Sequence, residues 1–529
     1  MPRKSWGHDA MLTAFAEHLR TIWPDVDWRE HDDVIHADIG ARYLRAMTKY
    51  FRAQQWRIGT IVARENGRGL DVRYCFYATL HPGWVELRVE LDPGERTLPS
   101  LTNVAIAADW FEREIEDLFS IRFTEHPRLG DFVLHNDRLP ENLGLMRPQV
   151  QSAADIPEQT REWRPKRVLE EEGAFVMTVG PVYSGEAESA LFLLETVGED
   201  VVRAVPRLFF KYRAIEKIAE GRTVQDVLLL AERCNGTSAI GNGLAYCQAV
   251  ERATGITVPA RALSLRTFFA ELERLRHHMT SVREICASTA LQVAESQALW
   301  IEEQLLRVSG ELTGHRYLFG VLAIGGLMTD YDRGALETAV ADVELLVRRV
   351  EPLRKALENA SSFLDRIEQV GIVSGEAARA FEIVGPFARA SGVCADMRAV
   401  QPYDAYPSVR FDVPAETEGD GYARLRVLFS EMIQSLHIMR QVVAGLPAGA
   451  VVGNTPAGAG SALGWSEAPR GASVQWVECD AQGIVLRYRL TPPSFRNWHG
   501  FHVATEDFAF QDFPIILATL DLSVAENDR

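Results

Sequence analysis

The sequence lacks any pairing of cysteines that would hold zinc or an iron–sulfur cluster. Its six cysteines are scattered, and no two form a CxxC pair: Cys75, Cys234, Cys247, Cys286, Cys394 and Cys479. Isolated thiols fit a reducing compartment and provide no ready metal site. Any iron–sulfur cluster that works with this protein is therefore expected on another chain.

Long hydrophobic runs are also missing. No stretch approaches the roughly 18 consecutive apolar residues of a transmembrane helix, and the most apolar segment near the C-terminus, FPIILATLDLSVA, is interrupted by Asp521. The N-terminal MPRKSWGHDAMLTAF has basic residues but neither a continuous apolar region nor a small-residue cleavage site, which argues against a secretory signal. We expect a cytoplasmic protein that contacts the membrane only through partners.

Positive charge is in short supply. The chain has 56 Lys and Arg against 73 Asp and Glu, a formal net charge of -17. Binding to nucleic acid phosphates needs basic faces that are not evident in this sequence, so nucleic acid is excluded as a general partner. With 529 residues, of which 47% are hydrophobic, the chain is predicted to be globular and to hold more than one domain.

The pattern along the chain predicts an α+β protein. Alternating apolar residues in LDVRYCFYATL and WVELRVELD, bounded by glycine- and proline-containing turns, predict two strands of one sheet within residues 1–136. A proline-rich, polar segment at 137–167 is interpreted as a linker. From 168 to 529, apolar residues recur every three or four positions in 262–308 and 334–367, which predicts a long-helix bundle. Small β elements are expected near 175–199 and 472–490.

The segment DWFEREIEDLFSIRFTEHP, residues 109–127, carries a signature in the first domain. It resembles WxERExxDxFGIxFxxHP of the complex I 30 kDa subunit, with Ser120 where the family usually has glycine. An ordinary amphipathic helix followed by a turn is the alternative. Order and spacing match over the whole segment, which favours the resemblance.

A second resemblance extends over most of the remaining chain. The blocks KYRAIEKIAEGR, AERCNG, LTGHRYLFG, GPFARASGVCADMRAVQPYDAY and SEAPRGAS occur in the order found in the complex I 49 kDa subunit and in group 4 nickel–iron hydrogenase large subunits. The fusion of both domains in one chain is similar to the formate hydrogenlyase large subunit family. The resemblance implies a 30 kDa-like α/β domain, then a helical 49 kDa-like domain with small flanking β elements.

The family's nickel-binding cysteines are replaced. Its motif ERxCGxCxxxH falls on residues 232–242 and places Asn235, Ser238 and Asn242 at the two cysteines and the histidine. Its motif DPCxxCxxR falls on 521–529 and places Ser523 and Glu526 at the other two cysteines. A nickel–iron centre needs soft thiolate ligands, so we expect no such centre.

Cys234 stands one residue before the first ligand position. On a helix, a shift of one residue turns a side chain by about 100°, so this thiol is expected to be a small buried residue. The chain stops at Arg529 with no tail to cleave after metal insertion, and its ENDR ending is similar to the EVDR ending of the complex I 49 kDa subunit. We expect no maturation peptide.

The resemblance implies three catalytic residues. In complex I a histidine of the early hairpin helps to hold the quinone headgroup, and the hairpin GPVYSGEAES places Tyr183 there. Tyrosine donates a hydrogen bond, but its reference pKa near 10 makes it a poorer proton relay than histidine. Arg470 of SEAPRG matches the arginine that overhangs the hydrogenase metal site, and Asp521 begins the last motif. Asn235, Ser238, Asn242, Ser523 and Glu526 are expected to line the cavity.

Charged residues on the predicted helices have two interpretations. They form a proton path, or they form a buried ion-pair network that positions the helices. The residues concerned are Glu232, Arg233, Glu271, Arg274, His277 and His278. Both interpretations stay open at this stage.

Three functions are compatible with these features. The first is a large subunit of a membrane-associated complex that couples electron transfer from a partner's [4Fe-4S] cluster to the reduction of quinone, or another acceptor, and to ion translocation. The second is a structural subunit that docks a hydrophilic arm onto a membrane ion-translocating module. The third, an active hydrogenase, is opposed by the four missing cysteines. The resemblance implies an iron–sulfur small subunit and antiporter-like and heel membrane subunits as partners, with the complex on the inner face of the cell membrane.

Overall fold

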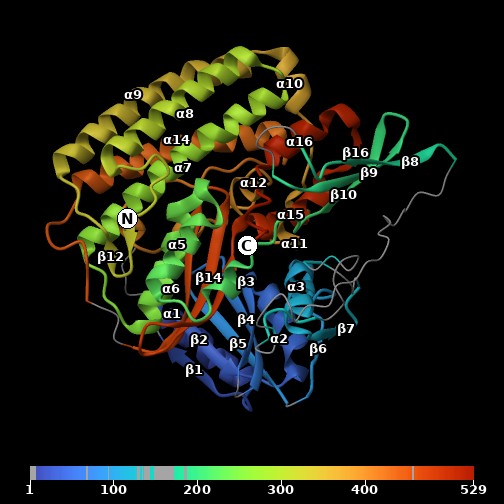
Figure 1. Cartoon of the computed structure of the whole chain (residues 1–529), viewed down its shortest axis with the longest axis vertical. Coiled ribbons are helices and arrows are strands. Elements are labelled where there is room, and N and C mark those ends of the chain that lie inside the picture. Colours follow the sequence, from blue (N-terminus) through green and yellow to red (C-terminus); the bar gives the residue numbers. More distant parts are fainter. Residues whose placement is uncertain are drawn as a thin grey trace. The chain divides into compact units, whose positions relative to one another are not determined.

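The chain folds into two compact units in a computed structural model (Figure 1). The structure describes residues 8–31, 33–66, 69–92, 94–127, 132–133, 135, 143–147, 150, 172–183, 188–454 and 458–529. Unit 1 comprises residues 1–166 with 380–382, and unit 2 comprises 167–379 and 383–529. Most of the predicted linker, 137–167, lies outside the described residues. The predicted α+β class is confirmed.

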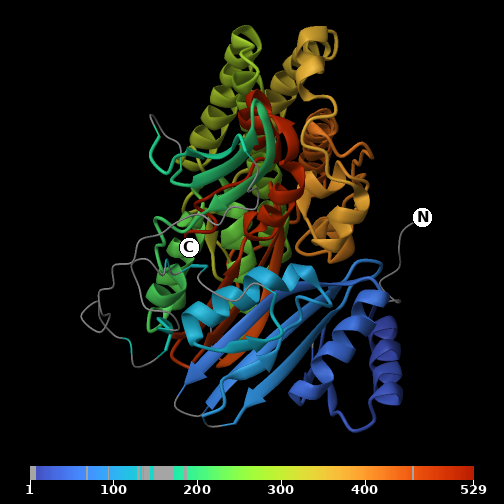
Figure 2. The same ribbon diagram turned by 90° about the vertical axis from the view of Figure 1, so that its right-hand side faces the viewer.

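Unit 1 is built on a five-stranded sheet of order β1-β2-β5-β4-β3 (Figure 2, blue). Its strands are β1 (Trp28–His31), β2 (Val34–Asp38), β3 (Trp56–Asn66), β4 (Gly69–Ala78) and β5 (Trp84–Leu91). β2 and β5 are parallel and the other neighbours antiparallel, with Tyr74 of β4 opposite Leu87 of β5. The two strands predicted from alternation are confirmed as β4 and β5.

The described part of unit 1 also contains three helices and a short parallel pair: α1 (His8–Ile22), α2 (Ala41–Ala53), α3 (Asp109–Phe119), β6 (Thr97–Pro99) and β7 (Arg122–Thr124), with the 3-10 turn η1 (Ile106–Ala108) before α3. The signature helix α3 holds the preceding loop through Glu112. The buried Glu112 carboxylate accepts hydrogen bonds from the Ser100 hydroxyl at 2.6 Å and the Leu101 amide at 2.6 Å, and burial raises its pKa to about 7.

Ser120 ends α3 in the left-handed conformation, with φ of 56° and its amide donating to the Glu116 carbonyl at 2.9 Å. A residue with a Cβ is disfavoured in this conformation, whereas glycine is not. The position therefore explains physically why glycine is usual there in the resembled family.

Unit 2 contains the predicted long-helix bundle, seen side by side in Figure 1 as α7 (Ala260–Ser288), α8 (Gln292–Thr313), α9 (Arg333–Glu358) and α14 (Gly421–Ala444). The periodic stretch 262–308 forms two helices, because the chain turns between them at Ala290, whose φ is 60°. Asp332 and Asp420 cap α9 and α14 by accepting amide hydrogen bonds from Gly334 and Ala423.

The predicted small β elements of unit 2 are confirmed as two sheets. One has the order β16-β10-β9-β8, from β8 (Ala174–Val179), β9 (Leu191–Val197), β10 (Asp200–Arg207) and β16 (Glu506–Ala509). The other is β13-β14-β15, from β13 (Gly460–Ala468), β14 (Gly471–Cys479) and β15 (Val485–Thr491). A two-stranded pair, β11 (Leu322–Ala323) and β12 (Gly326–Leu327), follows α8.

Shorter helices surround these sheets: α4 (Ile215–Ala219), α5 (Val224–Cys234), α6 (Ala239–Thr254), α10 (Ser361–Ile367), α11 (Gly375–Ala380), α12 (Gly385–Arg389), α13 (Met397–Val400), α15 (Pro493–Ala504) and α16 (Phe513–Leu520), with 3-10 turns η3 (Gly236–Ser238), η4 (Tyr406–Ser408) and η5 (Phe510–Asp512). Of the helices in the described ranges, none is both long and apolar enough to cross a bilayer.

Helix α6 lies directly on strand β13. A Cβ at Gly464 would stand 2.0 Å from the Ala245 carbonyl oxygen, and a Cβ at Gly241 would stand 2.7 Å from the Ala468 Cβ. The two glycines thus permit a backbone approach that any side chain would block. This contact fixes the N-terminal end of α6, where the candidate site begins.

Gly464→Ala is expected to destabilise unit 2 by roughly 3 kcal/mol, because the added methyl meets backbone rather than a movable side chain. The matched control is Gly310→Ala within α8, where the nearest atom to a Cβ is 3.6 Å away, and helix propensity predicts a gain of up to about 1 kcal/mol. Thermal unfolding of both variants measures the contrast. Equal melting temperatures would contradict the close approach.

Replacement of Ser120 tests the left-handed end of α3. Ser120→Gly and Ser120→Ala both remove the hydroxyl, but only glycine relieves the strained backbone, so the glycine variant should be more stable by about 1 kcal/mol. Amide hydrogen exchange of the last turn of α3 reports the difference locally. Slower exchange in the alanine variant would show that the backbone at 120 is not strained.

Candidate functional site

The turn after α5 and the C-terminal tail meet through a direct hydrogen bond. The Asn235 amide donates to the Glu526 carboxylate at 3.2 Å, and the other Glu526 oxygen accepts from the Ser494 backbone amide at 2.9 Å. Both site residues are buried, and burial raises the pKa of Glu526. Two of the four positions that correspond to thiolates are therefore joined to each other, with no space between their polar groups.

Ser523 is held by a residue that the sequence motifs did not single out. Its hydroxyl donates to the Glu188 carboxylate at 3.3 Å, and the amides of Val524 and Ala525 donate to the same group. Glu188 follows the hairpin GPVYSGEA, of which residues 184–187 lie outside the described residues. Glu188 belongs to the segment GPVYSGEAES, so the sequence offered a signal for this contact.

Ser238 ends the 3-10 turn η3 directly before α6, and Asn242 lies in the first turn of α6. Asn242 Oδ1 accepts from the Ser473 hydroxyl of β14 at 2.9 Å, so part of its side chain is used in packing α6 against the sheet. The Ser238 hydroxyl and Asn242 Nδ2 are buried, and neither has a hydrogen-bond partner within the part of the chain that is described. Buried groups of this kind are commonly satisfied by ordered water.

Asp521 and Arg470 form an ion pair beside His277. Arg470 Nη2 is 3.0 Å from Asp521 Oδ1, and His277 Nε2 is 2.8 Å from Asp521 Oδ2. Burial and the charge of Arg470 lower the pKa of His277 to about 3, so its imidazole is neutral. Although burial alone would raise the pKa of Asp521, Arg470 and His277 hold it below its ordinary value. The three groups are a carboxylate, a guanidinium and a neutral imidazole.

A small pocket adjoins this ion pair. Its walls include Phe387, Arg424, Arg470, Asn497, Thr519 and Asp521, and its cavity volume is about 20 Å³. That volume has room for about one water molecule. Arg470 also bonds to the Thr237 hydroxyl at 3.2 Å, which links the pocket to the turn.

Tyr183 is placed differently from the other predicted catalytic residues. Its hydroxyl bonds to the backbone carbonyls of Ala190 at 2.7 Å and Val179 at 3.2 Å, both in its own hairpin. Burial raises its pKa. The ring is only partly buried, and its phenol hydrogen is already used within the hairpin.

Two arginines whose role the sequence analysis did not predict hold the backbone of the site. Arg213 donates to the carbonyls of Cys234, Ala525 and Asp528, and so ties the turn to the tail. Arg276 donates to the Thr237 carbonyl. Their role is invisible in the sequence because their acceptors are main-chain oxygens, which every residue possesses.

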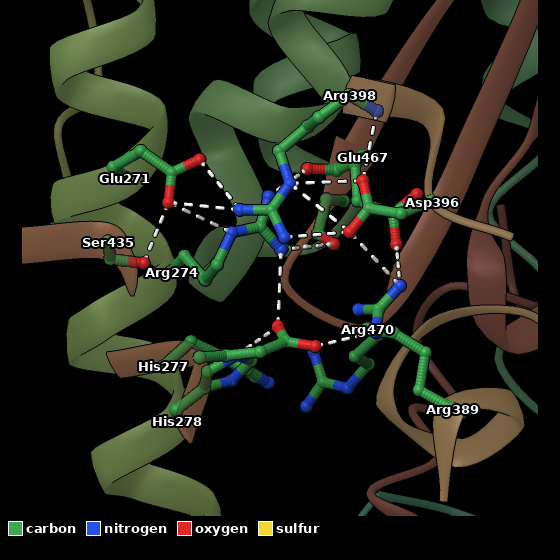
Figure 3. Close-up of polar contacts among 12 residues, drawn as sticks. Glu271, Arg274, His277, His278, Arg389, Asp396, Arg398, Ser435, Glu467 and Arg470 are labelled. Carbon is green, nitrogen blue, oxygen red and sulfur yellow. Dashed lines mark hydrogen bonds and ion pairs between the residues drawn. The ribbon is translucent and has the colours of Figure 1, made fainter. Parts of the chain in front are cut away.

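The predicted proton-path residues separate into two places. The Glu232 carboxylate accepts from the Gly320 amide at 3.3 Å, burial raises its pKa, and the half-exposed Arg233 lies over the Phe319 ring at 4.8 Å. Glu271, Arg274 and His278 instead belong to a buried charge cluster in the interior of unit 2, next to His277 (Figure 3). Figure 3 shows the Glu271 side chain of α7 directed toward Arg398, with Arg274 beside them.

The residues present do not fit a nickel–iron centre. Its four ligand positions hold an amide, two hydroxyls and a carboxyl group, which are hard donors. Cys234 is fully buried, and burial raises its pKa to about 12, so its sulfur is a thiol rather than a thiolate. No three His, Cys, Asp or Glu side chains of the described residues are grouped as metal ligands would be.

Family models match both units. The model for the 30 Kd subunit of respiratory-chain NADH dehydrogenase matches residues 36–147, and that for the 49 Kd subunit matches 297–459 and 451–529. Formate hydrogenlyase subunit 5 of Escherichia coli is 28% identical over 98% of this chain and 93% of its own length. The C/D subunit of the NADH-quinone oxidoreductase of Acinetobacter baylyi is 26% identical, over 84% of this chain and 82% of its own.

A third relative matches about two thirds of this chain. The D 1 subunit of the NADH-quinone oxidoreductase of Chloroherpeton thalassium is 30% identical over 68% of this chain and 88% of its own length. The two resemblances found in the sequence, to the 30 kDa and 49 kDa subunits, are thereby confirmed. The chain belongs to the complex I 30 kDa and 49 kDa subunit family, in the fused form of the formate hydrogenlyase and C/D relatives, and so to a lineage of subunits of multisubunit oxidoreductase complexes.

Proposed function

We propose that this chain takes the place of the large subunit in a membrane-associated oxidoreductase complex that has no nickel–iron centre. It couples electron transfer from a partner iron–sulfur subunit to the reduction of quinone, or another acceptor, and to ion translocation. The hydrogen bond between Asn235 and Glu526 carries the first part of the proposal, because it joins two ligand positions through hard donors.

The partners follow from what the chain lacks. A redox role needs a cluster, and the scattered cysteines provide none. The formate hydrogenlyase and NADH-quinone oxidoreductase relatives are named as subunits. We therefore propose a [4Fe-4S]-carrying small subunit bound to unit 2, and antiporter-like and heel subunits that attach the assembly to the inner face of the membrane.

A non-catalytic docking role is the second candidate. The phenol of Tyr183 is bonded to its own hairpin, and the pocket at Arg470 has room for about one water rather than a quinone ring. In this alternative the site is a closed scaffold that joins the hydrophilic subunits to the membrane module. Turnover of the whole complex would then be insensitive to the groups that line the site.

Metal content tests the absence of a nickel–iron centre. The complex purified through a tag on this chain should contain iron from its small subunit, no stoichiometric nickel, and no hydrogen-evolving or hydrogen-consuming activity, since thiolates are missing at all four positions. Elemental analysis and a hydrogen electrode make both measurements. About one nickel per chain, or a stable soluble monomer that binds no iron–sulfur subunit, would refute the proposal.

Tyr183→Phe separates the two candidates. The substitution keeps the ring and deletes the hydroxyl, so loss of a proton donor should lower turnover with the complex's native acceptor at least ten-fold, equivalent to about 1.4 kcal/mol of barrier. Tyr43→Phe in unit 1 is the matched control and should have no effect. Unchanged turnover in Tyr183→Phe, with normal assembly, would favour the docking role.

A further inference from the structure

The interior of unit 2 contains a connected cluster of buried charge. Its members are linked by contacts of 4.0 Å or less and are at most 2% exposed: Glu271, Arg274, His278, Arg389, Asp396, Arg398, Glu431 and Glu467. We call this set the buried cluster (Figure 3). It draws on α7, α12, α13, α14 and β13, together with Asp396, which caps α13.

The buried cluster has one carboxyl group too many. Among the described residues it pairs four carboxyl groups with three guanidinium groups and one imidazole, so full ionisation with a neutral His278 leaves one uncompensated negative charge. A buried charge without a partner is costly, and proteins commonly avoid it by neutralising one group. Because the buried cluster has one guanidinium group fewer than it has carboxyl groups, we expect one of its carboxyl groups to hold a proton.

Geometry selects the carboxyl group that would carry the proton. Three of the four carboxylates each contact two guanidiniums, namely Glu271, Asp396 and Glu431. Within the described part of the chain, the Glu467 carboxylate contacts one guanidinium, that of Arg389 at 2.8 Å, and its second oxygen accepts from the Met397 amide at 2.9 Å. It also shares Arg389 Nη1 with Asp396, which lies 3.3 Å from that nitrogen. Glu467 is the least stabilised anion of the set.

The surroundings of Glu467 and His278 agree with this choice. Arg274 and Tyr403 contact the Glu467 main chain, through its carbonyl and amide. Burial and the negative charge of Asp396 raise the pKa of Glu467 to about 6, while burial lowers the pKa of His278 in spite of its bond to Glu431 at 2.9 Å. Although burial opposes it, nearby arginines hold the pKa values of Glu271, Asp396 and Glu431 below their ordinary range.

We propose that the buried cluster is a proton-holding site, in which Glu467 takes up and releases one proton while the other three carboxyl groups stay ionised. The property belongs to unit 2 itself and does not depend on which acceptor the complex reduces. When Glu467 is protonated the cluster is neutral, and when the proton leaves the cluster carries one negative charge. The released proton passes to water as hydronium or to a neighbouring base.

The proton-holding site adjoins the Asp521 ion pair. His278 of the buried cluster and His277 of the ion pair are consecutive on α7, with ring centroids 6.3 Å apart. The Nδ1 atoms of both rings are buried and have no hydrogen-bond partner among the described residues. In a neutral imidazole whose Nε2–H donates to a carboxylate, Nδ1 is an acceptor, so each of the two rings keeps one acceptor nitrogen unused among the described residues.

Infrared spectroscopy tests the proposal without turnover. Difference spectra of the purified complex between acid and alkaline buffer, in light and heavy water, should contain carbonyl stretches of protonated carboxylic acids, among them one from Glu112 and one that we assign to Glu467, which disappears with a midpoint near pH 6. Glu467→Gln should lose this band, and Glu311→Gln, on an exposed position of α8, should keep it. Persistence of the band in Glu467→Gln, or its absence from the unmodified complex, would overturn the proposal.

His278→Gln gives a second, independent result. The imidazole is removed but an amide donor to Glu431 remains, so the band should persist if Glu467 holds the proton. Loss of the band in this variant would overturn the assignment to Glu467. Should Glu467→Gln fail to assemble, Glu467→Asp keeps a carboxyl group on a shorter chain and must shift both the band and its midpoint; an unshifted band would again refute the site.

The pH dependence of folding stability gives a further check, because proton binding to Glu467 is thermodynamically linked to folding. An acid whose pKa is higher in the folded than in the unfolded chain stabilises the fold relatively at low pH and loses that contribution as pH rises from its unfolded value near 4 through the folded value. The melting temperature of Glu467→Gln relative to the unmodified complex should therefore increase between about pH 4 and 7. A pH-independent difference would mean that Glu467 does not titrate in this range.

Discussion

The pairing of buried charge is the constraint on which unit 2 depends. Helices α7 and α14 and strand β13 meet across guanidinium and carboxylate groups that are withdrawn from water, and removal of one partner would leave an uncompensated charge. Arg389 shows the consequence, because it contacts Asp396, Glu431 and Glu467 from three different segments. The positions of these segments are specified jointly, which also fixes the frame around the candidate site.

Polar contacts join the end of α5 to the end of the chain, the two segments that carry the thiolate positions of the resembled family. In the resembled hydrogenases thiolates from two motifs share a metal, whereas here Asn235 and Glu526 bond directly and Glu188 binds the tail amides. Hydrogen bonds of this kind hold the same two segments together without soft ligands. The two distant segments of the chain are thus connected through amide and carboxylate groups.

The sequence predicted those features that depend on pattern. Strands β4 and β5 followed from alternation, and the helices of the bundle from three- and four-residue spacing, because both patterns reflect which face is buried. The break at Ala290 was not predicted, since alanine favours helix and only tertiary packing imposes its φ of 60°. Motif spacing likewise predicted where the turn and the tail lie in the chain.

The sequence could not predict contacts that depend on side-chain rotamers or join distant residues. The direction of the Tyr183 hydroxyl depends on its rotamer and on the carbonyl of Ala190. The contact of Arg389 with Glu467 joins residues 78 positions apart, and no local pattern relates them.

The close seating of α6 on β13 makes these two elements one mechanical part. The backbone of β13 at Gly464 lies directly against the backbone of α6, and at Ala468 only a methyl group lies between the two elements. Because the contact is this close, neither element can slide or tilt without the other. The N-terminal end of this part carries the Ser238 turn, and the strand end carries Glu467, with Arg470 following it. A movement of the Ser238 turn would therefore also move Glu467, the residue that we propose holds the proton, because no flexible side chains lie between α6 and β13 at these contacts.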